Sequence, residues 1–170
     1  DMSEMALKLG LGDSSGLEIN YPSEVRNSIP SRDGKLDMAK GILRRFLNNN
    51  LIDYKKEEVF KNQTDIEQDI ETIVSWADQG SATERYIIIE RLETMGYHAE
   101  QPLEDSYTGL ADIIKYTYLN QANWTQPDAM NAVIGQGQNA YSPIALNQMT
   151  NIFANGGYDY ELTLVQEIRT

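Results

Sequence analysis

The strongest local constraint in the sequence is the stretch from Gly135 to Gly157, which begins and ends with glycines. Ser142 followed by Pro143 is typical of a helix N-terminus, because a serine hydroxyl accepts a backbone N–H bond and proline suits the first helical position. Asn155 and Gly156 then supply the left-handed conformation that ends many helices. Between these limits apolar residues recur at helical spacing, at Ala145, Met149, Ile152 and Phe153. The stretch predicts a glycine turn that leads into a capped amphipathic helix.

The composition of the chain argues against nucleic-acid binding, a metal or cofactor site and a membrane span. The 170 residues carry a net charge of −12 and are 41% hydrophobic, which is ordinary for a folded domain. The acidic balance argues against a nucleic-acid partner, whose phosphates are neutralised by lysine and arginine. Cysteine is absent and His98 is the single histidine, so we expect no metal ion and no cofactor. No apolar run reaches the roughly 20 residues that a membrane span needs.

Residues 32–123 have the pattern of four amphipathic helices with short connections. Two of these helices are expected to begin at capping boxes, in which a serine or threonine and a glutamate three residues later satisfy each other's backbone donors. The pairs are Thr64 with Glu67 and Ser81 with Glu84. Apolar stripes follow the first two helices, at Leu36, Ala39, Leu43, Phe46 and Leu47 and at Ile66, Ile70, Ile73, Val74 and Ala77. Four amphipathic helices with short connections predict an antiparallel bundle.

Three further segments have weaker patterns. The run 86–89 is a tyrosine followed by three β-branched isoleucines and could form a strand, but the predicted caps on either side, with Gly96 as the stop, favour a helix. Asp105 or Ser106 is expected to open the last helix, with one side formed by Leu110, Ile113, Ile114, Thr117 and Tyr118. The tail 158–168 alternates apolar and polar residues and predicts a half-buried strand.

Three blocks of the sequence, taken in order, carry a resemblance to a known family. The first runs from Ala6-Leu7-Lys8-Leu9-Gly10-Leu11-Gly12 to Ile29-Pro30-Ser31, the second holds Trp124 and Asp128, and the third holds Ile134-Gly135-Gln136-Gly137, Ser142-Pro143 and Ala154-Asn155-Gly156-Gly157. In this order the blocks resemble the class B penicillin-binding proteins, in the part of the D,D-transpeptidase domain between the second and third active-site motifs. The resemblance covers residues 2–31 and 124–168.

The resemblance implies three segments. Residues 1–31 and 124–170 would belong to an α/β serine acyl-transferase fold, and 32–123 would be a helical insert that folds as a subdomain, because so long a connection is not left without structure. The fold class is therefore expected to be mainly α, with a partial transpeptidase fold. By the same analogy the stretch from Gly135 to Gly157 packs behind the active-site sheet, and Gly137 lets the backbone pass close to another element.

The catalytic motifs of that family are missing from the sequence. Its reaction needs a serine with lysine at the third following position, a Ser-x-Asn, and a strand with Lys-Thr-Gly or Lys-Ser-Gly. No serine in the chain begins either of the first two patterns, and neither form of the third occurs. The parent protein would be the enzyme, and this chain is expected to be inactive alone. We therefore predict no catalytic residue here, and the matched residues are expected to be structural.

The expected partners follow from the resemblance. Peptidoglycan peptide stems and β-lactams would bind through a catalytic part outside this chain, on the extracytoplasmic face of the bacterial cell membrane, with the anchor in a preceding part. A divisome or elongation partner could bind the insert, 32–123. A basic cluster before and within the first part of the insert is either a docking site for an acidic partner or wall polymer or a solvated helix face: Arg26, Arg32, Lys35, Lys40, Arg44 and Arg45. The alternative function is a stand-alone helical interaction module that acts through 32–123.

Overall fold

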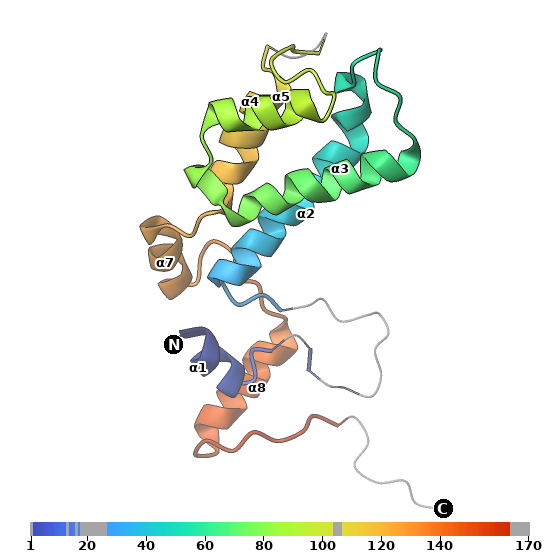
Figure 1. The fold of residues 1–170 in the computed structure, drawn as a ribbon. Coiled ribbons are helices and arrows are strands. Elements are labelled where there is room, and N and C mark those ends of the chain that lie inside the picture. Colours follow the sequence, from blue (N-terminus) through green and yellow to red (C-terminus); the bar gives the residue numbers. More distant parts are fainter. Residues whose placement is uncertain (1, 13, 16, 18–26, 104–106, 164–170) are drawn as a thin grey trace, which may run out of the picture. The chain divides into compact units, whose positions relative to one another are not determined.

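The computed structural model describes residues 2–12, 14–15, 17, 27–103 and 107–163, and these are mainly helical (Figure 1). The prediction of a mainly α chain is thus confirmed. The chain divides into two compact units, one that combines Asp1–Ser31 with Gln126–Thr170 and one that is Arg32–Thr125. One boundary lies at the predicted end of the first segment, and the other lies two residues beyond the predicted end of the helical block.

The unit Arg32–Thr125 is built from helices of three kinds. Its α-helices are α2 (Arg32–Asn50), α3 (Gln63–Ser75), α4 (Arg85–Thr94), α5 (Leu110–Asp112) and α6 (Asn120–Ala122). Short 3-10 helices are η1 (Leu51–Tyr54), η2 (Trp76–Asp78) and η3 (Gly80–Ala82), and the π-helix η4 (Ile113–Leu119) joins α5 to α6. The run 86–89 lies within α4, so helix and not strand forms there.

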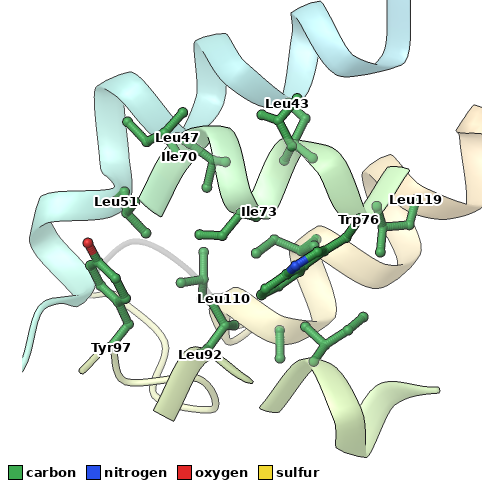
Figure 2. Packing of buried hydrophobic residues seen from close by; sticks show 14 of the residues in the cluster. Leu43, Leu47, Leu51, Ile70, Ile73, Trp76, Leu92, Tyr97, Leu110 and Leu119 are labelled. Carbon is green, nitrogen blue, oxygen red and sulfur yellow. The ribbon is translucent and has the colours of Figure 1, made fainter. Parts of the chain in front are cut away.

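These helices share one hydrophobic core (Figure 2). Leu43 and Leu47 of α2 are buried with Ile70 and Ile73 of α3, which confirms the centres of both predicted stripes. The outer members of the stripes are partly buried against the core, at Leu36, Ala39, Phe46 and Ile66. Burying each leucine or isoleucine side chain contributes about 1.5–3 kcal/mol, so these stripes supply much of the stability of the unit.

The N-terminus of α3 differs from the prediction. The helix begins after Asn62, whose side-chain oxygen accepts the Asp65 N–H at 2.9 Å, while the Asp65 carboxylate accepts the Asn62 N–H at 3.1 Å. The predicted pair, Thr64 and Glu67, lies two residues later and inside the helix. The capping box was therefore placed wrongly, because asparagine with aspartate can form the same pair of bonds as threonine with glutamate.

The second predicted capping box is also wrong. Ser81 lies in η3, and the N-cap of α4 is Glu84, whose side chain makes no capping bond to the described backbone. The end of α4 follows the prediction, since Met95 is the C-cap and Gly96 adopts a φ of +87°. A left-handed residue after a helix is the usual role of glycine.

The corrected cap of α3 gives a direct stability test. Asn62→Ala should lower the free energy of unfolding by about 1 kcal/mol, because it leaves the Asp65 N–H without its acceptor. The matched variant Thr64→Ala should change it little, because Thr64 is exposed within the first turn. Urea unfolding followed by circular dichroism measures both variants. If both variants lose the same free energy of unfolding, or Thr64→Ala loses more, Asn62 is not the residue that caps α3.

The last helix predicted within 32–123 contains a π-helical stretch, η4, that the sequence pattern did not predict. Leu110 and Ile114 are buried as expected, but Thr117 is exposed and Leu119, five residues after Ile114, is buried instead. This spacing follows from the wider i→i+5 hydrogen bonding of a π-helix. The predicted openers, Asp105 and Ser106, lie outside the described residues; the helix begins after the N-cap Gly109.

The π-helix also turns Lys115 inward. Its ammonium group donates to the carbonyl oxygens of Ser81 at 2.7 Å and Thr83 at 2.6 Å, and the residue is 9% exposed. A buried ammonium group must be hydrogen-bonded to be tolerated. Lys115 therefore ties the turn around η3 to η4 and has a structural part in the fold.

The unit that combines the two ends of the chain contains α1 (Met2–Lys8), α7 (Gln126–Val133) and α8 (Pro143–Ala154). The segment 158–163 has no regular structure, so the predicted strand is wrong there, and 164–168 lie outside the described residues. Asn155 provides the local reason, since its amide donates to Tyr158 O at 2.8 Å and its oxygen accepts the Tyr158 N–H at 2.9 Å. The chain is thereby held in a turn, and no described strand lies beside it.

Candidate functional site

The predicted glycine turn follows α7. Gly135 and Gly137 have φ values of +75° and +74°, a region that favours glycine. A Cβ on Gly137 would lie 3.5 Å from the Asn131 Cβ, an ordinary contact distance, and one on Gly135 would meet no described atom within 4 Å. Within the described chain, the positive φ accounts for both glycines, and no close backbone approach is found at Gly137; the close approach expected in the complete protein stays a prediction.

Asn139 holds this turn together. Its amide nitrogen donates to the carbonyl oxygens of Ala132 at 3.1 Å and Gln136 at 2.8 Å. Its side-chain oxygen accepts the Tyr141 hydroxyl at 2.7 Å. One side chain thus links the end of α7, the turn and the segment that enters α8. The neighbouring Ile134 is exposed and makes no comparable link within the described residues.

The ends of α8 follow the prediction. The Ser142 hydroxyl accepts the Ala145 N–H at 3.3 Å, and Pro143 occupies the first turn. At the other end Asn155 is the C-cap, and Gly156 and Gly157 have φ values of +84° and +100°. The motif from 135 to 157 is therefore a glycine turn followed by a helix that is capped at both ends.

The apolar stripe of α8 is narrower than predicted. Ala145 and Ile152 are buried and Met149 is half-buried, but Phe153 is 65% exposed. Phe153 was wrongly assigned to the buried face, because it lies about 100° further round the helix from Ile152.

The N-terminal segment joins this motif through two adjacent residues. Ser28 forms an antiparallel bridge with Ala140, with N–H to O distances of 2.6 and 3.2 Å. The side chain of Asn27, 7% exposed, donates to Gly12 O at 2.7 Å and accepts the Ser142 N–H at 2.6 Å. Asn27 therefore connects the loop after α1 to the start of α8, across more than one hundred positions of sequence.

Contacts from α1 extend this junction. The Ser3 hydroxyl donates to Pro30 O at 3.3 Å, beside a small cavity of about 170 Å³ that is also lined by Ile29 and Tyr141. Burial raises the pKa of Tyr141, so its phenol is neutral. Gly10, with a φ of +76°, lies against the side chain of Gln148 in α8. These contacts make a packed junction between the two terminal segments.

The matched residues are divided between the two units. Asp128 lies in α7, in the same unit as the motif from 135 to 157, whereas Trp124 belongs to the helical unit. There Trp124 lines a pocket of about 410 Å³ with Arg32 and Asp78 among its other lining residues. The site is therefore the junction of the two terminal segments, without Trp124.

A polar cluster in the helical unit consists of a lysine, an aspartate and a tyrosine, residue types that also occur in catalytic sites. Here these side chains bond to one another and have a structural role. The Asp69 carboxylate accepts the Lys61 ammonium at 2.5 Å and the Tyr97 hydroxyl at 2.8 Å. Burial and Asp69 raise the pKa of the Tyr97 phenol, so it remains a hydrogen-bond donor. Asp69 thus bonds both Lys61 and Tyr97, which ties the loop before α3 to the core.

Other charged residues have structural partners as well. Lys40 pairs with Asp78 at 2.6 Å and Arg44 with Glu71 at 2.7 Å, so the basic cluster on α2 is partly neutralised within the unit. The Arg44 guanidinium lowers the pKa of the Glu71 carboxyl. Arg26 lies outside the described residues. Within the described part of the chain no group of three or more histidine, cysteine, aspartate or glutamate side chains could hold a metal ion.

Comparison with known proteins gives no match: no family model, no curated protein and no solved structure matches this chain. Among the described helices, none has the length and apolar character required to cross a membrane.

Sequence reasoning missed the two asparagines that organise the site. Asn27 and Asn139 lie in turn-rich segments, where asparagine is common for purely local reasons. The sequence offered one weak signal for each: Asn27 directly precedes Ser28-Ile29-Pro30, and Asn139 closely follows the glycine turn. An asparagine side chain can both donate and accept a hydrogen bond, so either residue could link two segments. Their partners lie in distant segments or across a turn, so only the three-dimensional structure identifies them.

Proposed function

We propose that this chain is a non-catalytic scaffold portion of a penicillin-binding peptidoglycan D,D-transpeptidase, with the helical unit as an insert. One observation carries the proposal. The first and third of the blocks that resemble the family come from opposite ends of the sequence, yet they belong to one compact unit and are joined through Asn27, Ser28 and Ala140. A domain interrupted by an insertion has this property, because its two parts must share one packed body.

The chemistry of the parent protein would be serine acyl transfer. A hydroxyl activated by a nearby lysine attacks the D-alanyl-D-alanine carbonyl, and a second peptide amine resolves the acyl-enzyme. In this proposal those groups lie outside the chain, and β-lactams acylate the same serine. The junction around Asn27 and α8 contributes rigidity, since reacting groups must be held within a narrow range of positions. The parent would act in the cell wall, on the outer face of the cytoplasmic membrane.

The helical unit would then be an insertion within the transpeptidase domain. It has a complete core of its own and its own polar ties, such as the bonds of Lys61 and Tyr97 to Asp69. A unit with these properties can carry a docking surface without disturbing a catalytic domain. A divisome or elongation protein is the class of partner that this placement fits.

Covalent labelling by a fluorescent penicillin tests the proposal. The complete gene product should be labelled, the label should survive denaturation, and pre-treatment with an unlabelled penicillin should abolish it. The 170-residue chain alone should take up no label, because it lacks the required serine. Labelling of this chain, or a complete gene product that carries no Ser-x-x-Lys and takes up no label, would contradict the proposal.

A second candidate is a stand-alone interaction module that acts through 32–123. The observation that favours it is the set of large apolar side chains that the helical unit exposes, with Phe60 at 89% and Tyr86 at 66%. Where such side chains lie together in one contiguous patch, they are typical of binding surfaces. The sequence that flanks the chain in its gene separates the two candidates, since the module needs no transpeptidase motif on either side.

A further inference from the structure

The helical unit carries an open groove between α3 and α4. Its volume is about 500 Å³, and Trp76, 6% exposed, lies at its base. The Arg91 guanidinium lies over the indole ring, 5.4 Å from the centroid. Ile87 and the acidic Glu90 of α4, with Met95 at its C-cap, also line the groove. The groove therefore combines an apolar base, which suits an aromatic side chain, with a cation over that base and one carboxylate in its lining.

A side chain of that kind protrudes from the loop between η1 and α3. Phe60 is 89% exposed, although phenylalanine is among the residues most often buried. Two exposed acidic residues, Glu57 and Glu58, precede it closely in the same loop. The loop thus presents an aromatic ring beside two carboxylates.

The neighbours of Phe60 in the chain hold it near one end of the groove. On one side the methyl groups of Val59 lie against Gly96, where an added Cβ would come within 3.0 Å of them. On the other side Lys61 bonds Asp69 at 2.5 Å. Gly96 directly follows Met95, a residue of one groove wall, and Asp69 lies one helical turn before the other wall.

We propose that Phe60 of one copy enters the Trp76 groove of a second copy of this chain, and reciprocally, to form a two-fold dimer through the helical units. A projecting ring beside a recess on the same unit is the self-complementary surface that a two-fold interface requires. Aromatic anchors that fill pockets dominate the energetics of such interfaces. The acidic residues Glu57 and Glu58 are opposite in charge to Arg91, which lies over the base of the groove, and like in charge to Glu90, which also lines it.

Sedimentation velocity on the full chain, over a wide range of concentrations, tests this dimer. Measurements at 0.15 M salt keep the repulsion between two chains of charge −12 short-ranged, since the Debye length is about 8 Å. The wild-type chain should convert from monomer to dimer as concentration rises. Phe60→Ala should weaken dimerisation at least about tenfold without changing the melting temperature of the monomer, because this ring is exposed.

Two further variants complete the test. Thr72→Arg places a long charged side chain in the groove and should also weaken dimerisation, whereas a mixture of the Phe60→Ala and Thr72→Arg chains should form a heterodimer through the one intact contact. Tyr107→Ala removes another fully exposed aromatic ring and should leave dimerisation unchanged. A chain that stays monomeric at its highest soluble concentration would overturn the proposal. So would a dimer that Phe60→Ala does not weaken.

Discussion

A Gly109→Val variant is expected to lose about 3 kcal/mol or more of stability in the helical unit, because a side chain cannot fit there. A Cβ on Gly109 would lie 2.6 Å from the carbonyl oxygen of Glu100. The backbone cannot easily move apart, since the Ala111 N–H donates to Ala99 O at 2.9 Å directly beside this contact. Thermal unfolding should show the helical transition roughly 12–24 °C lower, at the usual 4–8 °C per kcal/mol for a unit of this size.

Gly41 provides the matched control. It lies within α2, and an added Cβ would meet no described atom within 4 Å. Gly41→Ala should therefore raise the free energy of unfolding by about 0.5–1 kcal/mol, because alanine restricts the unfolded chain and favours helix. Urea titrations of both variants give the comparison. Wild-type stability for Gly109→Val would show that the backbones at Gly109 and Glu100 do not approach each other as described.

An Asn27→Leu variant should destabilise the unit formed by the two ends of the chain. It would leave Gly12 O and the Ser142 N–H without their present partner, at a cost of about 1–3 kcal/mol for each group. Hydrogen exchange should therefore become faster for the amides of α8, while the unfolding transition of the helical unit stays unchanged. This pattern separates a local effect at the junction from a general loss of stability.

Asn27→Asp is the informative comparison. Its carboxylate can still accept the Ser142 N–H but cannot donate to Gly12 O. The exchange of the α8 amides should then lie between the wild-type and leucine variants. If Asn27→Leu leaves this exchange unchanged, Asn27 does not join the two segments.

Helix cores and helix stops were the parts of the fold that could be predicted from the sequence. The stripes around Leu43 and Ile73 and the ends at Gly96 and Gly156 depend on spacing or on one residue's backbone preference, so local pattern is sufficient. The start of α3 was misplaced by two residues because Asn62 competes with Thr64 for the same role, and sequence pattern does not rank them.

The features that could not be predicted depend on partners distant in sequence. The π-helix at 113–119 turns Lys115 toward the carbonyls of Ser81 and Thr83, which lie more than thirty residues earlier. Asn27 likewise meets Ser142 only once both terminal segments are folded together. Tertiary contacts decide such positions, and local propensity is a weak guide to them.

Removal of the helical unit from the complete gene product tests the proposed transpeptidase assignment most directly. Residues 32–125 would be replaced by a flexible glycine–serine linker, and covalent acylation by a fluorescent penicillin would be measured beside the intact protein. We expect the shortened protein to fold and to be acylated, because Asp1–Ser31 and Gln126–Thr170 form a compact unit without the helical one. A shortened protein that is folded but takes up no penicillin would contradict the view that the helical unit is an appendage to a transpeptidase body.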